Sequence, residues 1–500
     1  MPGYTKEDDF DEFGAAREQF ERIVTLLRSG ENAHITHGEL EQLVDLEGAE
    51  ILRLLVQGHL DRRAEKEPQL DTVAGADAEQ RNHRRGSSRQ LMTKFGAVEV
   101  KRRAYSDRHV PALHPLDGEL NLPEDTYSHG MRRRVAEEVA TGSYEDAVDS
   151  VKATTAGQVS KRQAEQLAIR SARDFDDFYV ARKAAGPERT DDLLVMTVDR
   201  KGVVMRPEGL REATQRKAEK AAREDQKGLS SGKKEHRKRM ATVGAVYTLE
   251  GYERTAEEIM GLEKAPEGPT PRAENKRVWA SVEKSLEEVV DEVFQEALRR
   301  DPDHRRPWAM LVDGDPDQLE RIQGCMRRYE VDVLVVIDFI HVLSYVWKAA
   351  YCFHPRRSDE AQAWVAERAL RILQGHASGV AAGMRRSATL RGLSYKERED
   401  VDTCANYLLK YCNLMRYDWC LPHGVPIASG VIEGACRHLV KDRMEITGAR
   451  WGLQGAEAVL RLRALRCSGD LDEYWRFHQS QEFKRNHLSR YEVYPLEMVA

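Results

Sequence analysis

The sequence predicts a multidomain protein built around an α/β domain with a mixed sheet. Between Trp308 and Val342, two short apolar runs of strand-forming residues are separated by about a dozen helix-compatible residues. A third apolar run, LLVMTVDR at 193–200, supplies another strand. Strand, helix and strand in succession form a parallel unit, so both strands are expected to end at the same edge of a sheet.

Each of these three runs ends in an aspartate: Asp199, Asp313 and Asp338. Ligands and catalytic groups of open α/β sheets collect at the carboxyl ends of the strands. Carboxylate oxygens are the hard ligands that Mg²⁺ prefers. Three acids at one sheet edge therefore predict a site for a divalent metal ion.

The first part of this domain is expected to span 190–342. After the first strand, KGVVMRP is predicted to be its hairpin partner and MATVGAVYTLEG at 240–251 a third strand, followed by a long helix at 274–300. The order is then strand, strand, strand, helix, strand, helix, strand. An insertion at 207–239 is predominantly basic and lacks a hydrophobic stripe, which is typical either of a solvated loop or of a clamp on phosphates.

Composition excludes some classes of protein. The formal net charge of −6 over 500 residues argues against a general nucleic-acid binder. No apolar stretch is long enough to span a membrane, and the acidic N-terminus lacks the features of a secretory signal, so we expect a cytoplasmic protein without a membrane partner. All seven cysteines lie between Cys325 and Cys467 without a CxxC pair, which favours buried free thiols.

Residues 1–63 are predicted to be a helical region for packing or dimerisation, because Thr36 and Glu39 match a capping box ahead of a helical apolar pattern. The charged segment 64–89 is predicted to be a polar linker. Residues 89–105 alternate like a hairpin. Three basic residues of this hairpin either lie on a solvated strand face or contact a DNA backbone: Lys101, Arg102 and Arg103.

The hairpin and the helices after it, at 90–180, are expected to form a DNA-binding domain. Three helical segments lie between 128 and 172, each opened by a serine, and Ser160–Gln163 fits a capping box. A turn with Gly157 separates the second helix from the third, as in a helix-turn-helix. Three short helices are common in any helical domain, so the pattern alone leaves DNA binding open. The third helix would offer these residues to the major groove: Lys161, Arg162, Gln163 and Gln166.

Residues 343–425 are expected to be an all-helical insertion, 426–480 to complete the sheet domain, and 481–500 to be a C-terminal tail. In SGVIEGACRHLVKDRMEITGARWG at 429–452, Glu433 is followed at four-residue spacing by two bases, a spacing that a solvated ion-pair row explains equally well. A helix after the fifth strand can nevertheless bring its acid to the strand-end aspartates. The basic residues of this segment are candidate DNA contacts: Arg437, Lys441 and Arg443.

Three segments resemble the DDE transposases of bacterial insertion sequences, closest to the ISKra group and more distantly to the ISL and Mutator-like groups. They are VDGD at 312–315, DFIHVLSYVW at 338–347 and SGVIEGACRHLVKDRMEITGARW at 429–451. PLDGELNLPEDTYS at 115–128 is similar as well, so the resemblance covers roughly residues 90–480.

This resemblance implies an RNase H-like catalytic domain with an all-helical insertion. It also implies a catalytic, metal-binding triad of Asp199, Asp313 and Glu433. Some relatives carry metal-binding cysteines near the N-terminus, whereas this chain has no cysteine before Cys325, so we expect no zinc.

Asp313 and Asp338 compete for the second position of the triad. In an RNase H-like sheet the first strand lies beside the fourth and the fifth lies beyond it, at about 4.8 Å per strand, which favours Asp313 as the neighbour of Asp199. Two metal ions no more than about 4 Å apart need the nearer pair. Asp338 and His341 are therefore expected in a supporting role, and a helix-capping aspartate is the simpler alternative.

The expected function is cleavage and strand transfer of double-stranded DNA by a transposase, with Mg²⁺ as cofactor, Mn²⁺ as a substitute, and a homodimer or larger assembly on DNA. Two rivals stay open. A DNA-binding regulator would use the helix-turn-helix and needs no strand-end acids, whereas a nuclease of the same fold would cut DNA without joining it.

Overall fold

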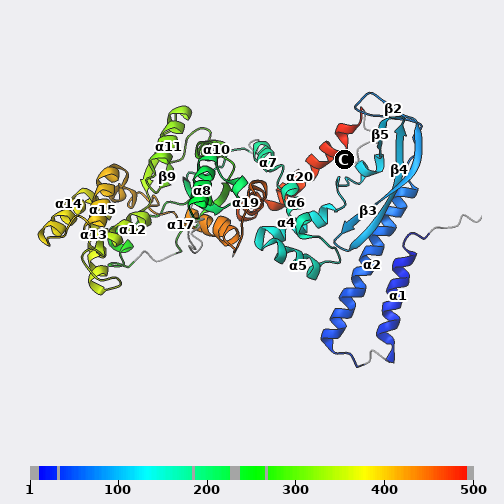
Figure 1. The fold of residues 1–500 in the computed structure, drawn as a ribbon, viewed down its shortest axis with the longest axis horizontal. Coiled ribbons are helices and arrows are strands. Elements are labelled where there is room, and N and C mark those ends of the chain that lie inside the picture. Colours follow the sequence, from blue (N-terminus) through cyan, green and yellow to red (C-terminus); the bar gives the residue numbers. More distant parts are fainter. Residues whose placement is uncertain are drawn as a thin grey trace, which may run out of the picture. The chain divides into compact units, whose positions relative to one another are not determined.

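The protein, represented by a computed structural model, is described over residues 11–30, 34–182, 186–225, 237–264, 269–446 and 448–492. The chain divides into two compact units, Met1–Tyr179 with Asp470–Ala500, and Val180–Gly469. Each combines helices with a sheet (Figure 1). Within the described ranges, no helix is long and apolar enough to cross a membrane.

The first unit begins with helices α1 (Gly14–Arg28) and α2 (His37–Glu65). The hydroxyl of Thr36 accepts a hydrogen bond from the Glu39 N–H, and the Glu39 carboxylate accepts one from the Thr36 N–H. The helix start predicted from this capping box is confirmed. The acidic start of the chain, residues 1–10, lies outside the described residues.

A three-stranded antiparallel sheet follows, with β4 (Gly96–Asp107) between β3 (His83–Thr93) and β5 (Val110–Leu113). The predicted hairpin is confirmed by the pairing of β3 with β4.

The polar linker predicted at 64–89 is wrong in its second half. Strands β1 (Val73–Ala74) and β2 (Gln80–Arg81) pair there, and β3 begins at His83. Arg81 is 2% exposed and lies 2.6 Å from the Asp77 carboxylate. Some of the charges that suggested a solvated linker are therefore paired, and the first half of β3, exposed on both faces, shows no apolar alternation.

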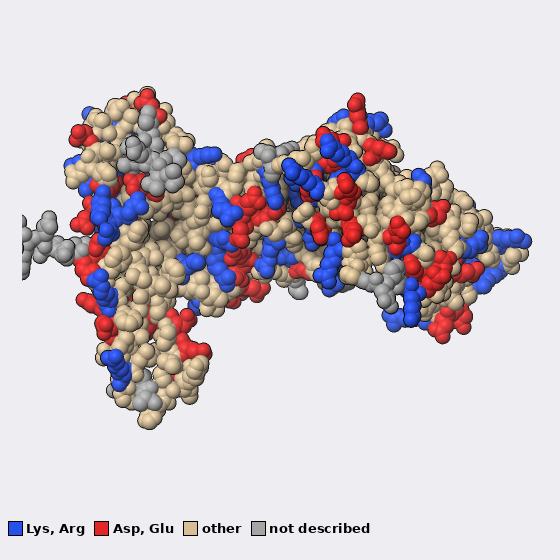
Figure 2. All heavy atoms as spheres, turned by 180° about the vertical axis from the view of Figure 1, so that it is seen from behind, with Lys and Arg blue, Asp and Glu red and all other residues tan. Residues whose placement is uncertain are grey.

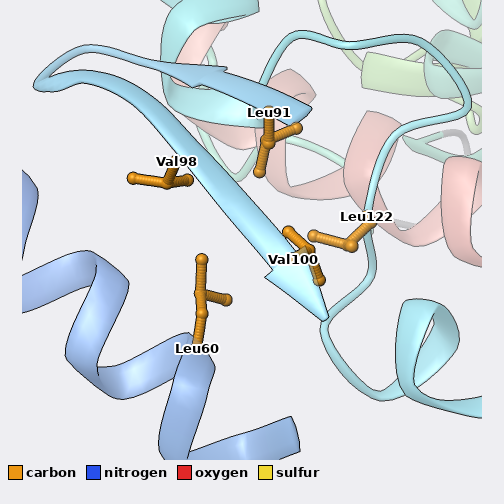
Figure 3. Packing of buried hydrophobic residues seen from close by; sticks show 5 residues of the cluster. All are labelled: Leu60, Leu91, Val98, Val100 and Leu122. Carbon is orange, nitrogen blue, oxygen red and sulfur yellow. The ribbon is translucent and has the colours of Figure 1, made fainter. Parts of the chain in front are cut away.

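Buried apolar side chains fasten α2 to this sheet (Figure 3). The cluster consists of Leu60 from α2, Leu91 from β3, Val98 and Val100 from β4, and Leu122. Burying a leucine or valine side chain stabilises a fold by roughly 1.5 to 3 kcal/mol. This contact holds the long helix α2 against the strands.

The three helices predicted between 128 and 172 are confirmed: α4 (His129–Thr141), α5 (Tyr144–Thr154) and α6 (Lys161–Ser171). The hydroxyls of Ser128, Ser143 and Ser160 cap them, each by accepting a hydrogen bond from the third N–H of its helix. The sequence located these helix starts because the capping residues are local signals.

Helix α20 (Leu471–Asn486) also belongs to the first unit. The Tyr474 hydroxyl donates to the carbonyl of Ser171 at 2.6 Å, and Glu482 forms a 2.8 Å ion pair with Arg132. The boundary predicted between 480 and 481 therefore falls inside a helix. Sequence patterns near residue 480 do not reveal this, since the bonded partner of Tyr474 lies 303 residues earlier.

The second unit is organised by a five-stranded mixed sheet with the order β10-β9-β6-β7-β8. Strands β6, β7 and β8 form an antiparallel meander, whereas β9 runs parallel to both β6 and β10. The predicted position of the first strand beside the fourth, with the fifth beyond it, is confirmed. The strands and their intervening helices are β6 (Leu193–Val204), β7 (Lys238–Leu249), β8 (Glu274–Ser281), α10 (Leu286–Arg300), β9 (Trp308–Val312), α11 (Pro316–Tyr329) and β10 (Leu334–Ile337).

The strands predicted at 193–200 and 240–251, and those on either side of α11, are present, but two of the predicted elements are wrong. KGVV continues β6 instead of forming a hairpin, because β7 pairs with β6 from Lys238 onward. Residues 274–281, predicted as helix, form β8. Trp279 of β8 is 2% exposed and packs against Gly244 of β7, where a Cβ would lie 3.0 Å from the indole ring. The capping box of Ser285 marks the true helix start.

Helices occupy the chain after β10, and the helical character predicted for this segment is confirmed (Figure 1). They are α12 (Phe339–Ala350), α13 (Asp359–Leu373), α14 (Ala377–Leu390), α15 (Glu399–Tyr411) and α16 (Tyr417–Cys420). Helix α14 was not predicted, because alanines make up much of its buried face and give a weak apolar pattern.

The motif after these helices does not form one regular helix. A π-helical turn (Cys436–Lys441) separates α17 (Gly430–Ala435) from α18 (Asp442–Met444), and α19 (Leu453–Ser468) follows. Such turns are rare and occur frequently at functional sites.

We expect Leu91→Ala to destabilise the β3–β4 pairing by about 2 to 5 kcal/mol, because it removes a buried side chain and leaves a cavity. Amide hydrogen exchange in β4 measures the loss as a smaller opening free energy. Leu46→Ala is the control, since Leu46 on α2 is 73% exposed. An equal loss in both variants would contradict the role given to the cluster.

Candidate active site

Adjacent strands bring Asp199, Asp313 and Asp338 to one edge of the sheet. In the parallel register Thr197 of β6 pairs with Leu311 of β9, two residues before Asp199 and Asp313 respectively. Asp338 directly follows β10, which pairs with β9 through the last residue of both strands. The three aspartates therefore lie side by side in the predicted order, with Asp313 in the middle.

Asp199 is not the end of its strand, as the sequence suggested. Strand β6 continues to Val204, and Asp199 pairs with Val243 of β7. The pairing of β6 with β9 stops at Thr197. Asp199 therefore lies past the end of the ladder on the β9 side, but inside the ladder on the β7 side. The polar residues after Val198 suggested that the strand ends there. The sequence does not reveal that the antiparallel partner β7 is long enough to pair with the rest of β6.

The candidate carboxylates line a single cavity of about 330 Å³. Its walls come from β6 and β9, from the residues that follow β9 and β10, and from α17. The cavity brings together the predicted triad and the two predicted supporting residues: Asp199, Asp313, Glu433, Asp338 and His341.

Asp338 is 8% exposed, and both of its carboxylate oxygens accept hydrogen bonds. Oδ1 accepts from the N–H groups of Ile340 and His341 at 2.8 and 3.4 Å, which caps α12. Oδ2 accepts from the Ser429 N–H at 2.8 Å, next to the start of α17. The helix-capping alternative is therefore confirmed, and Asp338 joins two helices that border the cavity.

Asp313 is half-buried and begins a tight turn between β9 and α11. Its Oδ1 accepts a hydrogen bond from the Asp315 N–H at 2.9 Å. Asp315 in turn caps α11 and forms an ion pair with Arg200 of β6. Gly314 between them has a φ of +90°, which L side chains rarely adopt. The turn has little freedom, so the direction in which Asp313 leaves the sheet is well defined.

Cys436 contacts the site and was missed by the sequence analysis. Its thiol lies 3.1 Å from Oδ2 of Asp199. Burial, followed by the negative charge of Asp199, raises the pKa of this thiol, so it stays protonated and donates to the carboxylate. The only sequence signal was its place three residues after Glu433, in the motif shared with the resembling family.

Glu433 projects from α17 as an exposed residue at the rim of the cavity. Partial burial of its carboxyl raises its pKa, and the negative charges of Asp338 and Asp199 raise it further, while His341 acts in the opposite direction. Like charges that disfavour ionisation indicate a concentration of negative charge. A bound cation would relieve it.

The donor set suits a hard divalent cation, because it consists of carboxylate oxygens. Within the described part of the chain, no three His, Cys, Asp or Glu side chains are close enough to hold one ion. Mg²⁺ does not need three, since it keeps several waters and binds one or two carboxylates together with substrate phosphates. Asp199 and Asp313, on adjacent strands, supply two such carboxylates.

The residues predicted to enter the major groove are exposed on α6. Lys161 forms a 3.6 Å ion pair with Glu145, and Gln163 accepts a hydrogen bond from the Ser160 N–H at 3.0 Å. Exposed pairs of this kind contribute little stability, so the Lys161 side chain is available to a phosphate or a base.

Of the basic residues predicted on the motif after α16, Arg437 and Lys441 are exposed, as a DNA contact requires. Arg443 is 2% exposed, and its guanidinium lies 4.7 Å from the centre of the Trp451 ring. This burial contradicts the DNA contact predicted for Arg443, because an interior cation cannot reach a phosphate. Its stacking on an indole ring is typical of a packing role.

Basic residues of the β3–β4 hairpin contact acids within their own unit. Lys101 lies 3.1 Å from Asp61 on α2, and Arg102 lies 2.8 Å from Asp117. The Arg102 side chain is 8% exposed, so its contact favours a structural role, whereas Lys101, with 58% of its side chain exposed, stays a predicted DNA contact.

Charges of both signs are interspersed over the face drawn in Figure 2. Of the basic insertion at 207–239, the structure describes the helix α8 (Glu212–Asp225) and the flanking residues, whereas residues 226–236 lie outside the described part of the chain. The predicted clamp on phosphates therefore stays a prediction.

We expect Glu433→Gln to stabilise the second unit at neutral pH in the absence of divalent metal. The folded-state pKa of Glu433 is raised, so its contribution to stability is present below the unfolded pKa of about 4.3 and is lost as the pH rises through the folded-state pKa. Glutamine does not ionise and keeps this contribution.

Thermal unfolding across this pH range measures the effect. The Tm difference between variant and wild type should be positive near neutral pH and shrink below the unfolded pKa. Glu445→Gln, in an exposed position outside the cavity, is the control. A difference that does not change with pH would exclude the charge of Glu433 as its cause.

Comparisons with known proteins give little further guidance. No protein family model matches the chain, and no curated protein sequence matches it. Among solved structures, the chain is similar to the Drosophila P element transposase strand transfer complex, with 11% sequence identity and a TM-score of 0.24. This match covers 73% of this chain and 82% of the other. A similarity this weak does not establish a shared fold.

Proposed function

We propose that this protein is a DDE-type DNA transposase, of the kind found in the ISKra group, which binds the ends of its insertion sequence and transfers them into target DNA. The observation that carries the proposal is the cavity at the strand ends, lined by Asp199, Asp313 and Glu433 from two strands and a helix. The strand order of the sheet and the helices between β10 and α17 agree with an RNase H-like domain carrying an all-helical insertion.

Each carboxylate has a distinct part in this proposal. Asp199 and Asp313 would hold divalent metal from adjacent strands, and Glu433 of α17 would be the third ligand. Mg²⁺, or Mn²⁺ in its place, supplies charge that activates the attacking oxygen and stabilises the leaving oxygen at phosphorus. All three carboxylates must be ionised to act, so protonation of Glu433, whose pKa is raised in the metal-free protein, would compete with metal binding as the pH falls.

DNA recognition is assigned to α4, α5 and α6. The exposed basic start of α6 fits the major groove of double-stranded DNA, with Lys161 and Arg162 at its first turn. Arg437 and Lys441, which follow Glu433 in the chain and are exposed, are proposed as further DNA contacts. The protein would act in the cytoplasm on the nucleoid, as a homodimer or larger assembly on DNA.

Single substitutions of the carboxylates test the chemistry. Asp199→Asn, Asp313→Asn and Glu433→Gln should each abolish cleavage of DNA carrying the element's ends, yet leave DNA affinity within a few-fold, because each removes a metal ligand and not a DNA contact. Asp317→Asn, at an exposed position on α11 outside the 330 Å³ cavity, is the matched control. Retained cleavage in any of the three variants would overturn its assignment.

The products of the same reactions separate the alternative functions. Cleavage followed by joining of the freed 3′-hydroxyl to target DNA is expected of a transposase. Cleavage without joining would identify a nuclease, and specific binding without cleavage a regulator.

A double substitution tests recognition. Replacing Lys161 and Arg162 with alanine should weaken binding to the element's ends by about 1 to 3 kcal/mol if a base edge is read, and reduce the salt dependence if only phosphates are contacted. Fluorescence anisotropy at several salt concentrations measures both. Lys66→Ala with Arg173→Ala removes the same charge from exposed positions outside α4, α5 and α6. An equal loss in both double variants would move recognition away from α6.

A further inference from the structure

Three tyrosine hydroxyls from the helical segment after β10 donate to backbone carbonyls at the strand ends. Tyr407 and Tyr411, one turn apart on α15, bond the carbonyls of Asp313 and Gly314 at 2.7 and 2.5 Å. Tyr417, at the start of α16, bonds the carbonyl of Ile337 at 2.7 Å. The acceptors are two residues of the turn after β9 and the last residue of β10, so they carry or adjoin two of the candidate carboxylates.

All three tyrosines are buried, with exposed fractions of 9, 7 and 0% for Tyr407, Tyr411 and Tyr417. Burial raises the pKa of the Tyr407 and Tyr417 hydroxyls, so these stay protonated donors across the physiological range. A buried carbonyl that loses its hydrogen-bond donor destabilises the fold, because its desolvation free energy is no longer offset by a hydrogen bond. The backbone at the two strand ends is therefore tied to the helical segment.

The turn and the two tyrosines of α15 are also in close van der Waals contact. A Cβ on Gly314 would lie 3.1 Å from a ring carbon of Tyr411 and 3.2 Å from the ring and hydroxyl of Tyr407. The backbone can approach the rings this closely because glycine has no side chain. The Tyr407 ring is itself held by stacking on Tyr345 of α12, with ring centres 4.2 Å apart.

We propose that Tyr407, Tyr411 and Tyr417 are positioning residues through which the helical segment sets the arrangement of the strand-end carboxylates, and with it the affinity for divalent metal. This inference rests on the proposed function, because it takes Asp313 as a metal ligand. It assigns the helical segment a part in building the metal site.

The physical reason is preorganisation. Asp313 follows the end of a strand, where the ladder no longer fixes the backbone. Without the two hydroxyls the turn samples other positions, so only a fraction of the molecules holds Asp313 in the position that binds metal. The apparent dissociation constant for metal then rises by the inverse of that fraction. Losing one buried hydrogen bond would weaken metal binding by about three- to ten-fold.

Tyrosine-to-phenylalanine variants at 407, 411 and 417 test the inference, since they remove only the hydroxyl. Hydrogen exchange of the Asp315 and Gln318 amides reports whether Tyr407 and Tyr411 hold the turn, and exchange of the Asp338 amide does so for Tyr417. Calorimetric titration with Mn²⁺ in the absence of DNA reports metal affinity. Tyr474→Phe is the matched control, because the buried Tyr474 also donates to a backbone carbonyl but belongs to the other unit.

Faster exchange at the strand ends together with weaker Mn²⁺ binding, in these variants and not in Tyr474→Phe, is the expected result. Unchanged exchange would overturn the positioning role. Faster exchange with wild-type Mn²⁺ affinity would overturn its link to metal. If the wild type binds no Mn²⁺ and Asp313→Asn changes nothing, the proposed function fails, while the exchange data still decide whether the hydroxyls hold the turn.

Discussion

The parallel pairing of β9 with β6 on one side and β10 on the other is the constraint on which the candidate site depends. A hydrogen-bonded ladder with strands about 4.8 Å apart fixes where each chain leaves the sheet. Side chains reinforce it: the Gln318 amide donates to the Val198 carbonyl at 2.5 Å, and the Thr197 hydroxyl to the Leu311 carbonyl at 3.1 Å. A register slip of one residue would turn every side chain of β9 to the other face.

The electrostatics of the cavity follow from the acids that lie close together in it, because each negative charge disfavours the ionisation of its neighbours. Arg200, directly after Asp199, forms its ion pair with Asp315, which does not line the cavity of the triad. Partial burial raises the pKa of Glu433, and repulsion by the carboxylates of Asp338 and Asp199 raises it further. Such an arrangement lowers the stability of the metal-free protein. Perturbed carboxylates of this kind cluster at functional sites, where a ligand offsets the repulsion.

Local signals in the sequence were sufficient for much of the fold. Serine and threonine caps located helix starts, and apolar runs located β6, β9 and β10, whose order in the sheet was expected from the family resemblance. Long-range partners decided the rest. Residues 274–281 form a strand because Trp279 packs against Gly244 of β7, and Asp199 lies within a strand because β7 is long.

The same distinction holds for the site. Asp199, Asp313 and Glu433 could be singled out, since acids after apolar runs and in a distinctive motif are visible along the chain. Cys436 and the tyrosines could not, because a thiol or a hydroxyl gains its role only from the partner it meets. The four-residue spacing of Tyr407 and Tyr411 places them on one helix face, but nothing local indicates which carbonyls they reach.

The hydroxyl contacts also impose an order on the maturation of the protein. They join residues 94, 97 and 80 positions apart, and the contact between Asp199 and Cys436 spans 237. Long loops of this kind close late in folding, and domains emerge from the ribosome N-terminal end first. A chain that stops before Tyr407 carries the three aspartates of the sheet edge without the hydroxyls that bond the backbone at Asp313, Gly314 and Ile337. The metal site that we propose is therefore incomplete until this helical segment has folded against the sheet.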